Sequence, residues 1–388
     1  MADFRDSLKL TLYQLIYHLV RCAPASRGTA HLLLVKTDEI GDYVLMRNLL
    51  RLFKHTGPYQ HYKITFVGNI VFRQLYESYD SDLADEVIWL DKKKFRSDLR
   101  YRFKLLKQIR RVKASDVISL VYSRIWRKDD VIVAVSPAPV KVGMKHNTRL
   151  ITSYEKRLTP VKIYTQLLDS GDDTLFDACR NARYIESLLQ IPPQRVSTAI
   201  TPKADISGLG LPARYFVVFP GSGIPEKKWP SARFAAVVHH MVQRYGLAPV
   251  VCGAPGDRAD SDAFLQEYAA PVLDLTGKTS LPGLLAVFRN AACLVSVDTG
   301  SVHLAAAVGC PVFALYSGLH YGRFAPYPPE LASQFYPVYP DEVDELIRER
   351  AAVDFEMISI DLVKTIPAEK LIARIDEAWA THLISKNT

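Results

Sequence analysis

The sequence predicts an α/β protein made of two similar domains, each built on a parallel β-sheet. The chain has 388 residues, which exceeds the usual size of one domain. Short apolar runs alternate with helical patterns along most of it, an order typical of parallel sheets. The alternation breaks over 191–213, where Pro, Ser, Thr and Gly gather, and then starts again. We therefore expect one domain over 31–190, a linker over 191–213 and a second domain over 214–330.

In the first domain, the run HLLLVKT at 31–37 predicts a buried strand, and a helical pattern follows at 43–54. Further β-rich runs predict strands at 63–69, 85–91, 116–122 and 131–136.

The second domain repeats this order. A strand is expected at 215–220 and a helix at 231–246, with Ser231 as its N-cap and Gly246 as its stop. More strands are expected at 248–253, 272–277, 293–298 and 311–316, and more helices at 260–270, at 280–291 and directly after Asp298. Ligands bind beyond the carboxyl ends of the strands in such sheets, so the loops after strands are where chemistry is expected.

The two ends of the chain lie outside these domains. Residues 1–30 predict an amphipathic helical extension, because Leu8, Leu12, Leu15 and Leu19 recur at helical spacing. This helix is too short and too polar to cross a bilayer, so it either lies on a membrane or docks on the protein, and docking is the commoner case. The C-terminal segment 331–388 is expected to hold helices that pack back across the domains.

Charge is spread unevenly along the chain. Residues 1–200 contain 33 Lys and Arg against 21 Asp and Glu, a net charge of +12, and the excess is concentrated at 91–113. A basic half indicates an acidic partner, unless it is only a solvated helix face. Nucleic acid is not expected, since no specific binding motif is present. The five cysteines lack metal-ligand spacing and favour a reducing cytoplasm.

Two loops after strands combine glycine with charged residues. In TDEIGD (37–42), Gly41 permits a tight turn, and Asp42 is either a helix cap or a catalytic carboxylate. In PGSGIPEKKWP (220–230), glycines and a serine are able to expose several backbone N–H groups as an anion nest, beside Lys227 and Lys228. A plain turn with solvated lysines is the alternative.

The third loop is DTGSVH (298–303), at the start of an alanine-rich helix. Thr299 and Gly300 begin that helix, whose first N–H groups and positive dipole end suit a diphosphate. His303 lies one turn further and is either a phosphate donor or a buried structural residue.

Three segments together resemble glycosyltransferase family 9, the ADP-heptose:lipopolysaccharide heptosyltransferases: VKTDEIGDYVL, FPGSGIPEKKWP and TGKTSLPGLLAVFRNAACLVSVDTGSVHLAAAVGCPVFALY. The resemblance covers roughly residues 31–330. It implies a GT-B fold, in which two Rossmann-like domains face each other across a cleft. The N-terminal domain then binds the acceptor and the C-terminal domain the nucleotide sugar.

The resemblance also implies inverting transfer of a heptose from ADP-heptose, with no cofactor and no bound metal. By motif position, the family's catalytic aspartate falls on Asp42 and its ribose contact near Asp257. Its diphosphate contacts fall on Ser222, Gly223, Lys227, Thr299, Gly300 and His303, with Asp298 shaping the loop. The family's acceptor is an acidic inner-core glycolipid, for which basic residues of the first half are expected to serve: Lys93, Lys94, Arg96, Arg124 and Arg149. The expected location is the cytoplasm, either free or peripheral at the inner membrane.

The chain departs from the family pattern at Tyr43, Arg47 and Asn48, and at 316–326, which lacks the usual glycine-proline start. A related enzyme with another sugar donor and another surface glycan therefore stays open as an alternative. Two further alternatives are a non-catalytic protein that binds nucleotide sugars or glycolipids and, because of the basic segment 91–113, a nucleic-acid binder. The presence of Asp42 favours an enzyme over the non-catalytic binding protein, because a protein that has lost turnover no longer needs a catalytic base.

Overall fold

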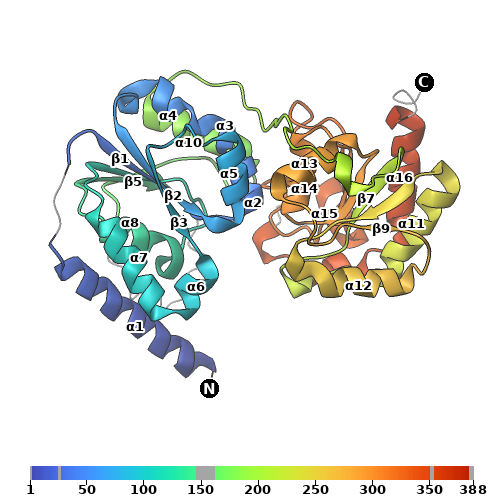
Figure 1. Ribbon diagram of the computed structural model, residues 1–388, viewed down its shortest axis with the longest axis horizontal. Coiled ribbons are helices and arrows are strands. Elements are labelled where there is room, and N and C mark those ends of the chain that lie inside the picture. Colours follow the sequence, from blue (N-terminus) through green and yellow to red (C-terminus); the bar gives the residue numbers. More distant parts are fainter. Residues whose placement is uncertain (1, 25–27, 146–161, 350–353, 384–388) are drawn as a thin grey trace. The chain divides into compact units, whose positions relative to one another are not determined.

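The computed structural model describes residues 2–24, 28–145, 162–349 and 354–383, and the chain forms two compact units (Figure 1). The first unit comprises Met1–Asp172 and Ala178–Val196; the second comprises Asp173–Asp177 and Ser197–Thr388. Each is built on a six-stranded sheet in which all paired strands are parallel. The prediction of an α/β fold with two parallel sheets is confirmed.

The sheet of the first unit has the order β3-β2-β1-β4-β5-β6. Its central strand is entirely buried, and Leu33 lies opposite both Thr65 and Val117. The strands are β1 (His31–Lys36), β2 (Lys63–Asn69), β3 (Glu86–Leu90), β4 (Asp116–Ser119), β5 (Val140–Met144) and β6 (Gln166–Leu168). The α-helices are α1 (Ala2–Cys22), α2 (Ile40–Val44), α3 (Arg47–Leu50), α4 (Leu52–His55), α5 (Arg73–Tyr79), α6 (Lys92–Ser97), α7 (Leu99–Arg111), α8 (Val131–Val135) and α10 (Asp177–Leu189).

One strand prediction in this unit is wrong. The apolar run 131–136 forms the helix α8, which follows a π-helical turn, η3 (Trp126–Asp130), and the strand lies further along as β5. Every residue of α8 is buried. A short run that is apolar on all sides fits a buried helix as well as a buried strand, so periodicity does not separate the two.

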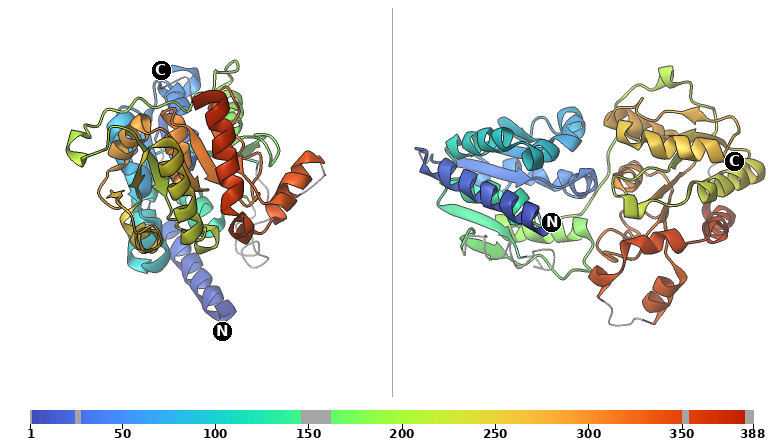
Figure 2. Two further views of the ribbon diagram at one scale, coloured as in Figure 1. Left: turned by 90° about the vertical axis from the view of Figure 1, so that its right-hand side faces the viewer. Right: turned by 90° about the horizontal axis from the view of Figure 1, so that it is seen from below.

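Helix α1 packs on the first unit, along α7 (Figures 1 and 2). Tyr13, Tyr17 and Val20 are buried there. The Tyr13 hydroxyl donates to the Arg96 carbonyl at 2.5 Å, and the Arg102 guanidinium lies 3.8 Å from the centre of the Tyr13 ring. These contacts fix one face of α1 to the protein. No helix in the described parts of the chain is both long and apolar enough to cross a membrane.

The sheet of the second unit has the order β12-β11-β10-β7-β8-β9. Its strands are β7 (Tyr215–Phe219), β8 (Ala248–Val251), β9 (Leu273–Asp274), β10 (Leu294–Val297), β11 (Val312–Leu315) and β12 (Phe335–Val338). Its helices are α11 (Ser231–Tyr245), α12 (Arg258–Glu267), α13 (Leu281–Asn290), α14 (Gly300–Ala307), α15 (Asp341–Arg348) and α16 (Ala368–Ala378). Ser231 is the first residue of α11 rather than its N-cap, and Gly246 ends the helix with φ +61°.

The C-terminal segment belongs to the second unit. Strand β12 extends the sheet, and α16 packs on α11, where the rings of Trp379 and Tyr245 stack with centres 4.3 Å apart. The Trp229 indole N–H donates to the Ile366 carbonyl at 2.9 Å. The segment therefore anchors the loop that follows β7.

Candidate functional site

The loop after β1 is fixed by the carboxyl ends of the neighbouring strands. The buried Lys36 ammonium donates to the Asp38 carboxylate at 2.7 Å and to the Leu120 carbonyl, beyond β4, at 3.1 Å. The Asn69 amide, at the end of β2, donates to the Asp38 carbonyl at 2.8 Å. This part of the loop is therefore held from both adjacent strands.

Asp42 stands in the first turn of α2 and is partly buried. Its Oδ2 accepts the backbone N–H of Glu39 at 3.2 Å, which is the capping role expected of an Asp at that place. The carboxylate is thus held at the carboxyl edge of the first sheet. A cap and a catalytic base are compatible roles, since a carboxylate has lone pairs for more than one donor.

The bulky residues after Asp42 point into the protein. Tyr43 is buried, with its ring stacked 4.2 Å from that of Phe72, and its hydroxyl donates to Asp80 at 2.7 Å. Arg47 makes a two-pronged ion pair with the same carboxylate, at 2.9 and 2.8 Å. Tyr43 and Arg47, which depart from the family pattern, therefore have a structural role. Their side chains attach α2 and α3 to the interior of the unit.

Two charged residues beside this loop, Lys92 and Asp129, were not among the site residues that the sequence predicted. The Lys92 ammonium, at the start of α6, donates to Glu39 Oε1 at 2.6 Å. Burial lowers the pKa of Lys92, but the carboxylates of Glu39, Asp129 and Asp38 together outweigh it, so the net shift of this pKa is upward. Asp129 accepts the Thr37 hydroxyl at 2.6 Å, and burial raises its pKa to about 6, helped by the Asp38 charge. Lys92 belongs to the basic run that the sequence highlighted, whereas Asp129 had no local signal.

Four of the five basic residues predicted for the acceptor are described, and they lie in two different places. Lys93, Lys94 and Arg96 are exposed on α6, directly after β3. Arg124 is buried, lies 3.1 Å from Asp130 Oδ1 and stacks over the ring of Tyr164, so its charge is used inside the unit. Arg149 lies outside the described residues.

In the second unit, β7 and β10 are neighbours, so the two predicted phosphate loops leave the sheet at the same edge. A chain of hydroxyls joins them. The Ser296 hydroxyl donates to the Phe219 carbonyl at 3.3 Å and lies 3.1 Å from that of Ser301, which lies 2.7 Å from that of Thr299. This links the start of α14 to the residue before the PGSG loop.

The PGSG loop runs close to the loop after β8. A Cβ on Gly221 would lie 2.5 Å from Cβ of Asp257, so only glycine fits there. Asp257 Oδ2 accepts the Ala254 N–H at 2.8 Å, and burial raises the pKa of Asp257. Ser222 is buried and its Oγ accepts the Ile224 N–H at 3.2 Å, while Gly223 is exposed with open space around it. The loop therefore opens outward at Gly223.

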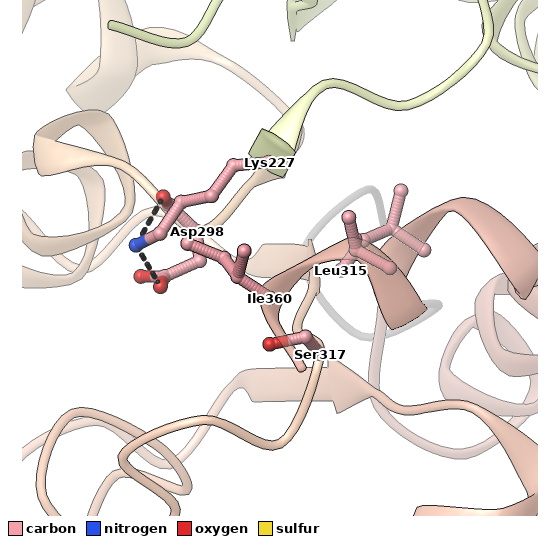
Figure 3. Close-up of a pocket in the computed structure, with 6 residues that line it drawn as sticks. Lys227, Asp298, Leu315, Ser317 and Ile360 are labelled. Atoms are coloured by element: carbon pink, nitrogen blue, oxygen red, sulfur yellow. Dashed lines mark hydrogen bonds and ion pairs between the residues drawn. The ribbon is translucent and has the colours of Figure 1, made fainter. Parts of the chain in front are cut away.

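Lys227 joins the two loops. Its ammonium donates to Asp298 Oδ2 at 2.5 Å and to the Asp298 carbonyl at 3.4 Å, as Figure 3 shows. The pair lines a pocket with Leu315, Ser317, Ile360 and Val363 (Figure 3). The neighbouring Lys228 instead pairs with Asp260 at 2.6 Å. A cation and the free end of a helix thus lie at one sheet edge.

Helix α14 begins at this edge with Thr299 as its N-cap, and none of the described side chains caps it. Its first N–H groups are therefore available to an anion. His303 is buried, and its Nδ1 lies 2.6 Å from the Tyr327 hydroxyl. Burial lowers the pKa of His303 to about 4, so the ring is neutral near pH 7.

Comparison with known proteins gives a family for this arrangement. A family model for glycosyltransferase family 9 (heptosyltransferase) matches residues 102–335. The resemblance drawn from the loops is confirmed, although the match begins after the Asp42 loop. The chain is 29% identical over 130 residues to lipopolysaccharide heptosyltransferase 3 of Escherichia coli strain K12, covering 32% of this chain and 37% of that protein. The chain thus matches little more than a third of that relative's length.

Solved structures share the fold. A glycosyl transferase family 9 protein from Veillonella parvula has a TM-score of 0.63 at 20% identity, covering 92% of this chain and 97% of that chain. The heptosyltransferase WaaC of E. coli, solved with ADP, has a TM-score of 0.61 at 18% identity, covering 91% and 99%. At this identity the likeness shows the fold alone, and it confirms the GT-B class with two Rossmann-like units.

Proposed function

This chain belongs to glycosyltransferase family 9, and we propose that it is an inverting glycosyltransferase that moves a heptose from ADP-heptose to an acidic lipopolysaccharide inner-core acceptor. One observation carries the proposal: Lys227 bridges the loops after β7 and β10, beside the uncapped start of α14. A fixed cation and free N–H groups at one edge suit a diphosphate. The named relatives, a lipopolysaccharide heptosyltransferase and WaaC with ADP, support this choice of acceptor and donor.

The donor diphosphate is proposed to lie over the start of α14. Backbone N–H groups around Ser222, Gly223, Thr299 and Gly300 would donate to its oxygens, together with the Lys227 ammonium and His303 Nε2. Asp298 holds Lys227 in position before the donor arrives. Negative charge grows on the diphosphate as its bond to the sugar breaks. Hydrogen-bond donors that are already in position therefore stabilise the transition state most. Asp257 is proposed to contact the ribose.

Asp42 is proposed as the catalytic base. Its carboxylate takes the proton of the acceptor hydroxyl while that oxygen attacks the anomeric carbon. A new carbon–oxygen bond forms, the bond from the anomeric carbon to the diphosphate breaks, and ADP leaves with the electron pair. Attack from the face opposite the leaving group inverts the configuration.

Lys93, Lys94 and Arg96 are proposed to contact the acidic acceptor, with Lys92 fixing the start of α6 against the Asp42 loop. These exposed cations follow β3, at the same sheet edge as Asp42, and they lie in the half of the chain that carries the positive charge. We propose that the reaction takes place in the cytoplasm and requires no bound cofactor.

A panel of nucleotide sugars tests the donor, because a ligand that binds only the folded state raises its apparent stability. ADP-heptose should raise the melting temperature most. A stronger effect of another nucleotide sugar would instead favour the related enzyme with a different donor, and no effect from any of them would refute the proposal.

Asp42→Asn tests the base. The variant should lose transfer activity and keep its stabilisation by ADP-heptose, because it removes only the proton acceptor. Glu77→Gln, a change to an exposed carboxylate on α5, serves as the matched control and should keep full activity. Near-normal turnover by Asp42→Asn would remove the assignment. A wild-type protein that binds ADP-heptose without transfer would favour the non-catalytic alternative.

A further inference from the structure

Helix α1 has a second apolar face that is partly exposed. Leu8, Leu12, Leu15 and Leu19 are 54%, 36%, 55% and 55% exposed. Their spacing of four, three and four residues places them in one stripe along the helix. Contiguous apolar surface of this kind marks an interaction site in a folded protein.

The opposite face of α1 already accounts for its docking on the first unit. Leu10, Tyr13, Tyr17 and Val20 are buried, and the Arg102 guanidinium lies between the rings of Tyr13 and Phe95 at 3.8 and 4.2 Å. A helix that only covers the protein needs one apolar face, with polar residues outside. The leucine stripe is therefore left without a role in folding.

Basic helices lie alongside α1. Arg110 of α7 donates to the Ala23 carbonyl at 3.0 Å, just beyond the C-terminal end of α1, and Tyr13 contacts the Arg96 carbonyl at the end of α6. Helix α7 contains no acidic residue. The exposed cations of α6 and α7 are Lys93, Lys94, Arg96, Arg100, Lys104 and Arg111.

We propose that α1 docks the first unit on an anionic lipid surface. The leucine stripe enters the boundary between headgroups and acyl chains, and the exposed cations of α7, Arg100, Lys104 and Arg111, contact lipid phosphates. A second copy of the chain is a poorer occupant, because pairing two stripes would bring two sets of cationic helices together. The proposal is independent of which sugar is transferred.

Flotation of the full-length protein with vesicles tests this. Wild type should float with phosphatidylglycerol–phosphatidylethanolamine vesicles, much less with phosphatidylcholine vesicles, and less as salt increases. The double variant Leu15→Asp and Leu19→Asp should reduce the bound fraction about 10-fold, since charge on the stripe opposes insertion. Leu167→Asp changes a leucine of similar exposure (48%) on strand β6 and should float like wild type.

A second variant, Arg100→Glu with Lys104→Glu, leaves α1 intact and should also reduce flotation. ADP-induced thermal stabilisation should stay unchanged in every variant, which separates a docking defect from a damaged donor site. Equal flotation of wild type and both double variants would overturn the proposal. So would a dimer, seen by light scattering, that the leucine variant abolishes while wild type fails to float.

Discussion

Lys227 and Asp298 are 71 residues apart in the sequence, yet their side chains form an ion pair of 2.5 Å at the carboxyl edge of the second sheet. Both are largely shielded from solvent, with side chains 19% and 17% exposed. The pair joins the loops after two adjacent strands, so a change at either residue alters both walls of the proposed donor site.

Lys227→Ala should weaken ADP binding about 10-fold to 100-fold, because hydrogen bonds to charged groups contribute roughly 1.5–3 kcal/mol. Isothermal titration with ADP measures this. Lys228→Ala is the matched control, because Lys228 pairs with Asp260 instead. This variant should bind ADP with the affinity of wild type. Equal losses in the two variants would mean that general charge, and not this pair, attracts ADP.

The pH dependence of the free energy of unfolding should reflect the buried His303 ring. Burial lowers its pKa from 6.5 to about 4, so between these values the unfolded chain binds a proton that the folded chain does not. The free energy of unfolding should therefore fall as the pH falls through this window, by about 2 kcal/mol from pH 7 to pH 5. His303→Gln should remove that part of the decrease in urea unfolding. Parallel pH profiles for wild type and variant would show that His303 is not buried as described.

Asp129 should behave in the opposite way. Its pKa is raised from 3.8 to about 6, first by burial, so the folded chain binds the extra proton and this part of its stability is lost as the pH rises. Asp129→Asn removes the buried charge. The variant should gain about 2 kcal/mol relative to wild type between pH 4 and pH 8, as measured by urea unfolding. A relative stability that does not change with pH would contradict this.

The PGSG loop approaches Asp257 closely at Gly221. Gly221→Ala should destabilise the protein by about 1–3 kcal/mol, because its Cβ would lie 2.5 Å from Asp257 Cβ. Adding Asp257→Gly should restore part of the loss in a double-mutant cycle. Gly223→Ala is the control, with no atom within 4 Å of its Cβ, and should leave unfolding unchanged. Additive effects of the first two changes would rule out the contact.

Much of the fold follows from local patterns. Apolar runs bounded by turn residues predict β1, β7 and β10. These strands form where expected, because each is a short run of consecutive residues that are all buried. The same reasoning misassigned α8, where every side chain is buried and periodicity disappears. The meeting of the loops after β7 and β10 was also predictable, because the carboxyl ends of neighbouring parallel strands lie at the same edge of a sheet.

The sequence by itself determined which loops hold the glycines, the lysines and the acids, because short segments encode turns, helix starts and strands. Only the tertiary structure decided the partners of those side chains. In the folded protein, Lys227 pairs with Asp298, and His303 contacts Tyr327. Arg124 is buried beside Asp130. The fold also leaves a leucine stripe of α1 uncovered. Contacts of this kind depend on which distant segments the sheet brings together, and burial and ion pairing arise only from that packing.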